Sequence, residues 1–220
     1  MKALLNTFHQ KVPCYPDKCN CEIMREDLPV LQPMATISSL AYIFLGIIIW
    51  KKYKNKELLL LLILTGISSM FMHSTFSVLA RTFDFLSIFL LNAWLFLNMQ
   101  DKYRHKLMIY LLMVLMPSLV LFFIPKHPFI LTTFVFIPMT LLTFLHKGNK
   151  NIRRAIVSIV LACACFFLDQ NKVLCFHSIN LHGHTLWHIF TMSAVYFYYR
   201  FILERKSETR TDSIALSSNA

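Results

Sequence analysis

Long apolar runs separated by clusters of basic residues dominate this sequence. A transmembrane helix needs about 20 mostly apolar residues, and seven runs approach that length, at residues 34–50, 57–79, 83–99, 106–124, 128–146, 154–169 and 183–200. With 56% hydrophobic residues, the chain of 220 residues also has more apolar surface than a soluble domain of this size can bury. We therefore predict an all-α polytopic membrane protein, a bundle of seven transmembrane helices. The run at 154–169 is the weakest of the seven, because its unbroken apolar stretch is short, and six spans are the alternative.

The net charge of +11 is concentrated in alternate loops. Basic clusters follow residues 50, 99, 146 and 200, whereas the loops between them hold only Arg81, Lys126 and Lys172. The positive-inside rule then places the N-terminus outside and the C-terminus in the cytoplasm. Regular alternation favours seven spans over six and explains the charge without a nucleic-acid partner. We predict an integral protein of a bacterial inner membrane or a eukaryotic endomembrane.

Three regions follow from this topology. Residues 1–33 form a polar extracytoplasmic segment with no secretory signal peptide, residues 34–204 form the transmembrane domain, and residues 205–220 are a disordered cytoplasmic tail rich in Ser, Thr and charge. Cys14, Cys19, Cys21 and Cys175 fall on the outer side, where disulfides persist. Spacing allows Cys175 to pair with any of the first three. Cys21 and Cys175 are the candidate pair.

Polar groups inside a membrane are costly, and they usually face a bundle interior or a water-filled cavity. Five of them lie at similar depth near the predicted outer surface: Ser69 and His73 late in the second span, Asp84 at the start of the third, and His184 and His188 at the start of the seventh. Residues four apart share a helix face, so Ser69 and His73 point the same way, as do His184 and His188. A compact bundle would bring these three helices together.

Three neutral imidazoles are a common protein ligand set for a catalytic zinc ion, which keeps its fourth position for water. Asp84 could then act as the base or as an orienting group for the centre. Each residue also has an ordinary explanation: a hydrogen-bonded interfacial histidine, Ser69 bonded to a helix carbonyl, or Asp84 favoured by the helix dipole. A transmembrane cytochrome with two histidines across a haem is a further alternative. The coincidence of all five groups favours a metal-dependent hydrolase.

These residues also carry a family resemblance. "SMFMH" at residues 69–73, Asp84 eleven residues after the histidine, and "HTLWH" at residues 184–188 resemble the motif set of the alkaline ceramidases. That family belongs to a superfamily of seven-span hydrolases that includes the adiponectin-receptor-like proteins.

The resemblance implies that His73, His184 and His188 bind zinc on the extracytoplasmic side. It implies that Asp84 positions or deprotonates the attacking water and that Ser69 stabilises the developing oxyanion. The implied reaction is hydrolysis of a ceramide-like membrane lipid to a sphingoid base and a fatty acid. Two alternatives remain: a receptor or sensor of the same superfamily with a structural zinc, and a hydrolase of another lipid amide or ester.

The segment "CNCEIMRED" followed by "LQPMATISSL" resembles the opening of the same family, where a Cys-Glu pair begins a calcium-binding segment. The resemblance implies a Ca²⁺ site that includes Asp17, Glu22 and Gln32. The match weakens at three positions, because Asn20 stands in place of the usual Trp before the Cys, Met24 replaces a polar ligand, and Gln32 stands where an acidic residue is expected. A solvated acidic patch is the alternative interpretation.

Overall fold

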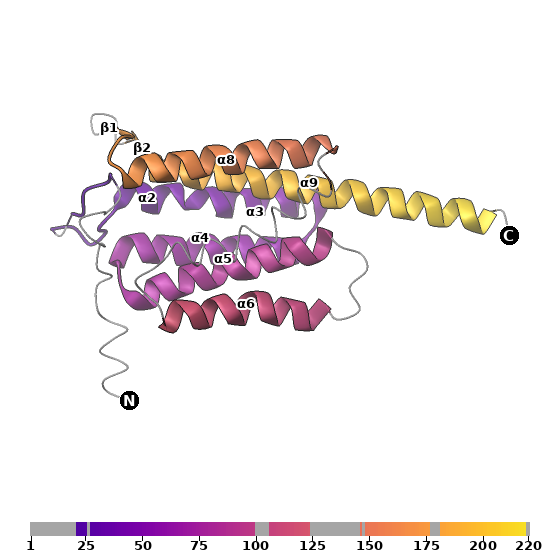
Figure 1. The fold of residues 1–220 in the computed structure, drawn as a ribbon, viewed down its shortest axis with the longest axis horizontal. Coiled ribbons are helices and arrows are strands. Elements are labelled where there is room, and N and C mark those ends of the chain that lie inside the picture. Colours follow the sequence, from indigo (N-terminus) through magenta and orange to yellow (C-terminus); the bar gives the residue numbers. More distant parts are fainter. Residues whose placement is uncertain are drawn as a thin grey trace.

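The protein is mostly helical, and its helices lie side by side in one elongated bundle (Figure 1). The computed structural model describes residues 21–25, 27–99, 106–123, 146, 148–176 and 181–218. Its elements are α2 (Pro33–Ser38), α3 (Leu40–Tyr53), α4 (Lys56–Thr75), α5 (Val78–Met99), α6 (Lys106–Phe123), α8 (Lys150–Gln170), β1 (Cys175–Phe176), β2 (Leu181–His182) and α9 (Gly183–Ser218). The span predicted at residues 128–146 lies outside the described residues apart from its last one.

Four helical segments are long and apolar enough to cross a membrane: Pro33–Tyr53, Lys56–Thr75, Val78–Met99 and Lys150–Gln170. They coincide with four of the seven predicted spans, and they indicate a protein embedded in a membrane. A shorter apolar stretch, Lys106–Met116, begins α6. Helix α9 is long but less apolar, because its first five turns contain His184, His188 and Arg200. The count of seven spans and the orientation of the termini stay predictions.

The turn between α4 and α5 differs from the predicted boundaries. Helix α4 ends at Thr75 because Phe76 adopts a left-handed conformation (φ 51°) and its N–H returns to the carbonyl of Met72. The hydroxyl of Ser77 then accepts a hydrogen bond from the N–H of Ala80, which caps the new helix at 3.2 Å. Asp84 was predicted to open a helix. That prediction is wrong, because Asp84 lies well inside α5.

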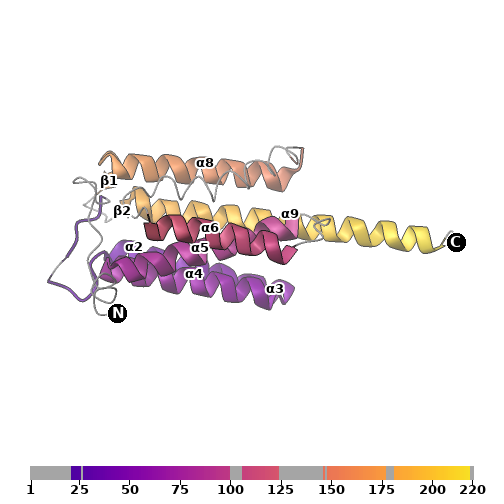
Figure 2. The same cartoon turned by 60° about the horizontal axis from the view of Figure 1, so that its bottom comes forward.

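The main hydrophobic core lies in one half of the bundle. Its fully buried members come from five helices: Ile49, Leu58, Leu62, Leu95, Met99, Ile152 and Ile202. Helix α9 packs most extensively on α8 and also contacts α2, α3 and α5. Figure 2 shows α9 between α8 and the other helices.

The opposite end of the bundle gathers the polar elements. The end of α4, the start of α5, helix α2, the end of α8 and the start of α9 meet there, next to the β1–β2 hairpin (Figures 1 and 2). A disulfide joins Cys21 to Cys175 across 154 positions of sequence, with the two Cα atoms 5.2 Å apart. This is the candidate pair named from the sequence. The bridge fastens the N-terminal segment to the hairpin that leads into α9.

The far end of α9 differs from the predicted disordered tail. The helix continues to Ser218 and projects beyond the rest of the bundle (Figure 1). Extending a helix that already exists costs far less than nucleating one, because each added residue gains a hydrogen bond. The backbone of residues 205–218 is therefore helical, although the polar composition of this stretch predicted a disordered tail.

Candidate metal centre

Three histidines from two helices converge at the polar end of the bundle. His73 lies in the last turn of α4, and His184 and His188 lie in the first two turns of α9. One nitrogen from each ring lies within 4.8 Å of the others. His73 and His188 are only 4% and 3% exposed, so both rings are shielded from solvent. The group could hold a metal ion.

The imidazole nitrogens of His73 and His184 lie at the separation that a tetrahedral ion requires. Nε2 of His73 and Nε2 of His184 are 3.1 Å apart. Two nitrogens on a tetrahedral zinc ion, each at its usual bond length, are separated by about 3.3 Å. The ring centroids of the three pairs lie 4.7 to 5.3 Å apart. The donor set therefore fits a zinc ion in number and chemistry, and the separation of the His73 and His184 nitrogens matches the expected spacing.

Asp84 and Ser69 lie beside this group but do not belong to it. Ser69 is buried at 4% exposure, contacts the Ser39 hydroxyl at 3.0 Å, and lies within hydrogen-bonding reach of the Asp84 carboxylate. Oδ1 of Asp84 is shielded and has no hydrogen-bond partner among the described residues. An unpaired buried carboxylate oxygen is costly. Asp84 thus presents a free acceptor at the end of the bundle where the histidines meet.

The N-terminal segment contacts two of the histidines. Oε1 of Gln32, a fully buried side chain, lies 3.0 Å from Nδ1 of His73. Oγ of Ser38 lies 2.8 Å from Nδ1 of His188. Metal-binding histidines commonly use their second ring nitrogen in such contacts, which leaves the first free for the ion.

Asp169 fixes the start of α9. It is fully buried; one carboxylate oxygen accepts the N–H of His184 and the other the N–H of Cys21, both at 3.1 Å. Gly183 permits this close approach, because a Cβ there would lie 2.3 Å from the carbonyl oxygen of Cys165. Helix α8 thereby sets the position of His184.

The residues of the predicted calcium set have other partners. Both carboxylate oxygens of Glu22 accept backbone N–H groups at the start of α2, from Met34 at 2.6 Å and Ala35 at 2.8 Å. Gln32 contacts His73, and Asp17 lies outside the described residues. The described contacts connect Glu22 and Gln32 to the histidine group, and calcium binding stays a prediction.

Sequence reasoning missed Ser38 and the role of Gln32. Ser38 and its neighbour Ser39 are polar residues within an apolar run, the same signal that identified Ser69, and that signal would have found them. Gln32 precedes the run, and no local pattern relates it to His73, which is 41 residues away. His182, two residues before His184, is buried at 3% exposure in β2, where it pairs with Cys175.

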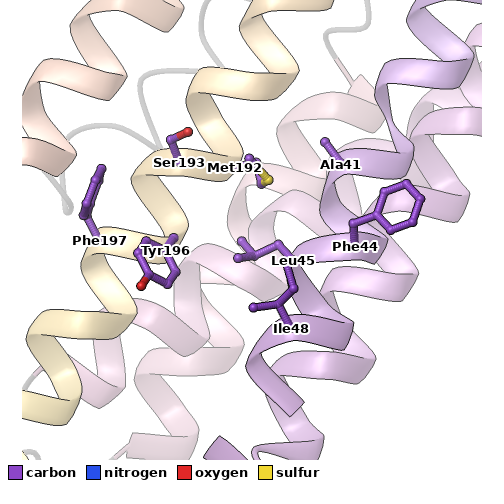
Figure 3. Close-up of a pocket in the computed structure, with 8 residues that line it drawn as sticks. All are labelled: Ala41, Phe44, Leu45, Ile48, Met192, Ser193, Tyr196 and Phe197. Carbon is purple, nitrogen blue, oxygen red and sulfur yellow. The ribbon is translucent and has the colours of Figure 1, made fainter. Parts of the chain in front are cut away.

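An open apolar groove of about 350 Å³ runs between α3 and α9 (Figure 3). Ala41 lines it on α3, one turn after Ser38, and Met192 lines it on α9, one turn after His188. Its lining continues to Ile48 and Tyr196, so the groove extends away from the histidines along the apolar helices.

No protein-family model, curated protein or solved structure matches this chain.

Proposed function

We propose that this chain is a zinc-dependent integral-membrane amidase that hydrolyses ceramide-like lipids to a sphingoid base and a fatty acid. The observation that carries the proposal is the buried group of His73, His184 and His188, with the Ser69–Asp84 pair beside it, in a bundle of apolar helices. Three neutral nitrogen ligands with room for a fourth ligand are typical of catalytic zinc. The resemblance of the motif set to the alkaline ceramidases supports the same reaction class.

Each residue has a defined task in this proposal. A zinc ion held by the three imidazoles would supply a water that ionises near neutral pH and would polarise an amide carbonyl. Asp84 accepts the proton of the attacking water through its unpaired Oδ1. Ser69, whose hydroxyl lies between Ser39 and Asp84, turns to donate a hydrogen bond to the developing oxyanion.

The surroundings of the histidines support an apolar lipid as substrate. The groove between α3 and α9 begins one turn from His188 and continues along α3, which belongs to a segment apolar enough to cross a membrane. An acyl chain placed there would stay in an apolar environment while its amide bond reached the histidines. The span from Ala41 to Ile48 corresponds to about 10 Å of helix. We propose that the reaction takes place near the extracytoplasmic surface.

The test is metal analysis combined with turnover by the full-length protein in detergent. We expect about one zinc per chain and release of fatty acid from a short-chain fluorescent ceramide. Stripping the metal with a chelator should stop the release, and adding zinc should restore it. Full activity of metal-free protein would contradict the proposal. Bound zinc without turnover of any lipid would favour a receptor or sensor with a structural zinc.

The same assay distinguishes an amidase from another lipid hydrolase. A ceramide and an ester-linked analogue with the same chains would be compared side by side, and membrane lipid extracts would be analysed before and after incubation. Preference for the amide, with accumulation of a sphingoid base, is the expected result. Turnover of the ester alone would support a lipid hydrolase but would contradict a ceramide-like substrate.

Asp84→Asn tests the proposed base separately from the metal. Asparagine keeps the size of the side chain but cannot accept the proton, so we expect kcat to fall about 100- to 10,000-fold. Zinc content should remain close to that of wild type, because Asp84 is not one of the grouped ligands. Thr82→Val is the matched control, since it removes a hydroxyl of the same helix that donates to the carbonyl of Val78. Unchanged kcat in Asp84→Asn would remove Asp84 from the mechanism.

A further inference from the structure

The segment around α2 touches two histidines that lie on two other helices. Gln32 immediately precedes α2 and contacts His73 of α4, while Ser38 ends α2 and contacts His188 of α9. A six-residue helix thus presents one polar side chain at each end to a different imidazole.

The orientation of the Gln32 amide follows from its second partner. Its Nε2 donates to the backbone carbonyl of Glu22 at 3.2 Å, and a carbonyl oxygen can only accept. Oε1 must therefore face Nδ1 of His73, and Nδ1 must carry the hydrogen. The lone pair of His73 is then on Nε2, the atom that faces His184.

A similar argument applies to His188. The carbonyl of Ala35, 2.9 Å from the Ser38 hydroxyl, can only accept, so the Ser38 oxygen is available to accept from Nδ1 of His188 at 2.8 Å. The backbone carbonyl of Ala35 also lies within hydrogen-bonding reach of His188. Both contacts place the hydrogen on Nδ1 and leave Nε2 free for a metal ion.

The segment is itself held in place. The Glu22 carboxylate accepts the N–H groups of Met34 and Ala35, which a helix start otherwise leaves unpaired. The N–H of Gln32 donates to the carbonyl of His73 at 3.1 Å, so Gln32 binds that residue through both backbone and side chain. Gln32 is fully buried, and water does not compete for its amide.

We propose that Gln32 and Ser38 are positioning residues of the metal centre, which fix His73 and His188 in the tautomer that binds the ion through Nε2. The inference rests on the metal-binding part of the proposed function and is independent of the lipid. Contacts of this kind typically change metal affinity by about 10- to 100-fold when they are removed. Gln32 should matter more than Ser38, because the Ala35 carbonyl remains available to His188.

The experiment measures binding of Zn²⁺ and Co²⁺ to full-length protein in detergent, without lipid substrate. Zinc affinity is determined by competition with a chromogenic chelator, and the Co²⁺ absorption spectrum reports the coordination geometry. We expect Gln32→Leu to weaken zinc binding about 10- to 100-fold and to alter the Co²⁺ spectrum. Ser38→Ala should have a smaller effect in the same direction.

Two further variants separate positioning from general stability. Thr36→Val removes a buried hydroxyl of the same helix that donates to the carbonyl of Gln32 at 2.7 Å and has no hydrogen bond to a histidine among the described residues. It should leave zinc affinity and the Co²⁺ spectrum unchanged. Gln32→Glu keeps an acceptor for Nδ1 of His73 and should bind zinc close to wild type. If Gln32→Glu and Gln32→Leu lose zinc affinity equally, the loss comes from the missing hydrogen bond between the Gln32 amide and the Glu22 carbonyl, and not from the contact with His73.

The outcomes distinguish this inference from the proposed function. If wild type binds neither metal, the metal centre itself is wrong. If wild type binds zinc and Gln32→Leu binds it equally well with the same Co²⁺ spectrum, the positioning role is wrong while the metal centre stands.

Discussion

Replacing His188 with alanine is expected to abolish metal binding and lipid turnover together. The change leaves two of the three nitrogen ligands, and a catalytic zinc site with three protein ligands does not tolerate that loss. Zinc content of the purified variant should fall to background, and fatty-acid release should fall to the rate without protein. Metal analysis and the fluorescent ceramide assay measure the two effects on one preparation.

The controls for this variant lie on the same helix. Ser207→Ala removes an exposed hydroxyl of the same helix that donates to the carbonyl of Glu204, and it should keep both zinc and turnover. His184→Ala should reproduce the loss seen for His188→Ala, because both rings belong to one ligand group. Turnover that survives in His188→Ala after its zinc is lost would separate the activity from the histidines and reject the mechanism.

Breaking the disulfide between Cys21 and Cys175 is expected to give the largest change in stability. The bridge closes a loop of 154 positions, and the loop-entropy relation assigns about 5 kcal/mol to a closure of that length. This value is an upper bound, since helices that stay in a membrane explore fewer conformations than a free chain. Cys21→Ser should lower the midpoint of thermal unfolding in detergent, as should a reducing agent added to wild type.

Loss of the disulfide should also affect the metal centre. The N–H of Cys21 and the N–H of His184 both donate to the buried carboxylate of Asp169. If the broken disulfide lets Cys21 move away, the carboxylate can shift, and the backbone at His184 is then held less firmly. We therefore expect weaker zinc binding as well as lower stability. Cys163→Ser is the control, because that cysteine is free and exposed. A stable Cys21→Ser variant with normal zinc affinity would show that the other contacts of residues 22–32 are sufficient.

Much of the candidate site could be predicted because its parts obey rules that are local in sequence. Helical spacing aligned His184 with His188, and the charge pattern placed His73 at the same depth on another span. The structure brings these three rings together. The start of α5 could not be predicted in this way, because Phe76 takes a left-handed conformation that is rare outside glycine. As a result, Asp84 was placed at a helix start and not inside the helix.

The supporting contacts were beyond sequence reasoning for a different reason. Gln32 and His73 are 41 residues apart, and Ser38 and His188 are 150 apart. Nothing in a single sequence states which polar groups meet over such separations. Only the packing of α2 between the end of α4 and the start of α9 brings these pairs together.

The separation of the hydrophobic core from the histidines has a consequence for how such a protein can change. The residues that hold the helices together, such as Ile49, Leu95 and Ile202, lie in the half of the bundle away from the reacting groups. Substitutions of the histidines themselves therefore leave this apolar core intact. A lineage can alter or lose the chemistry at one end while it keeps a folded protein in the membrane, so that new substrates can be acquired without rebuilding the fold.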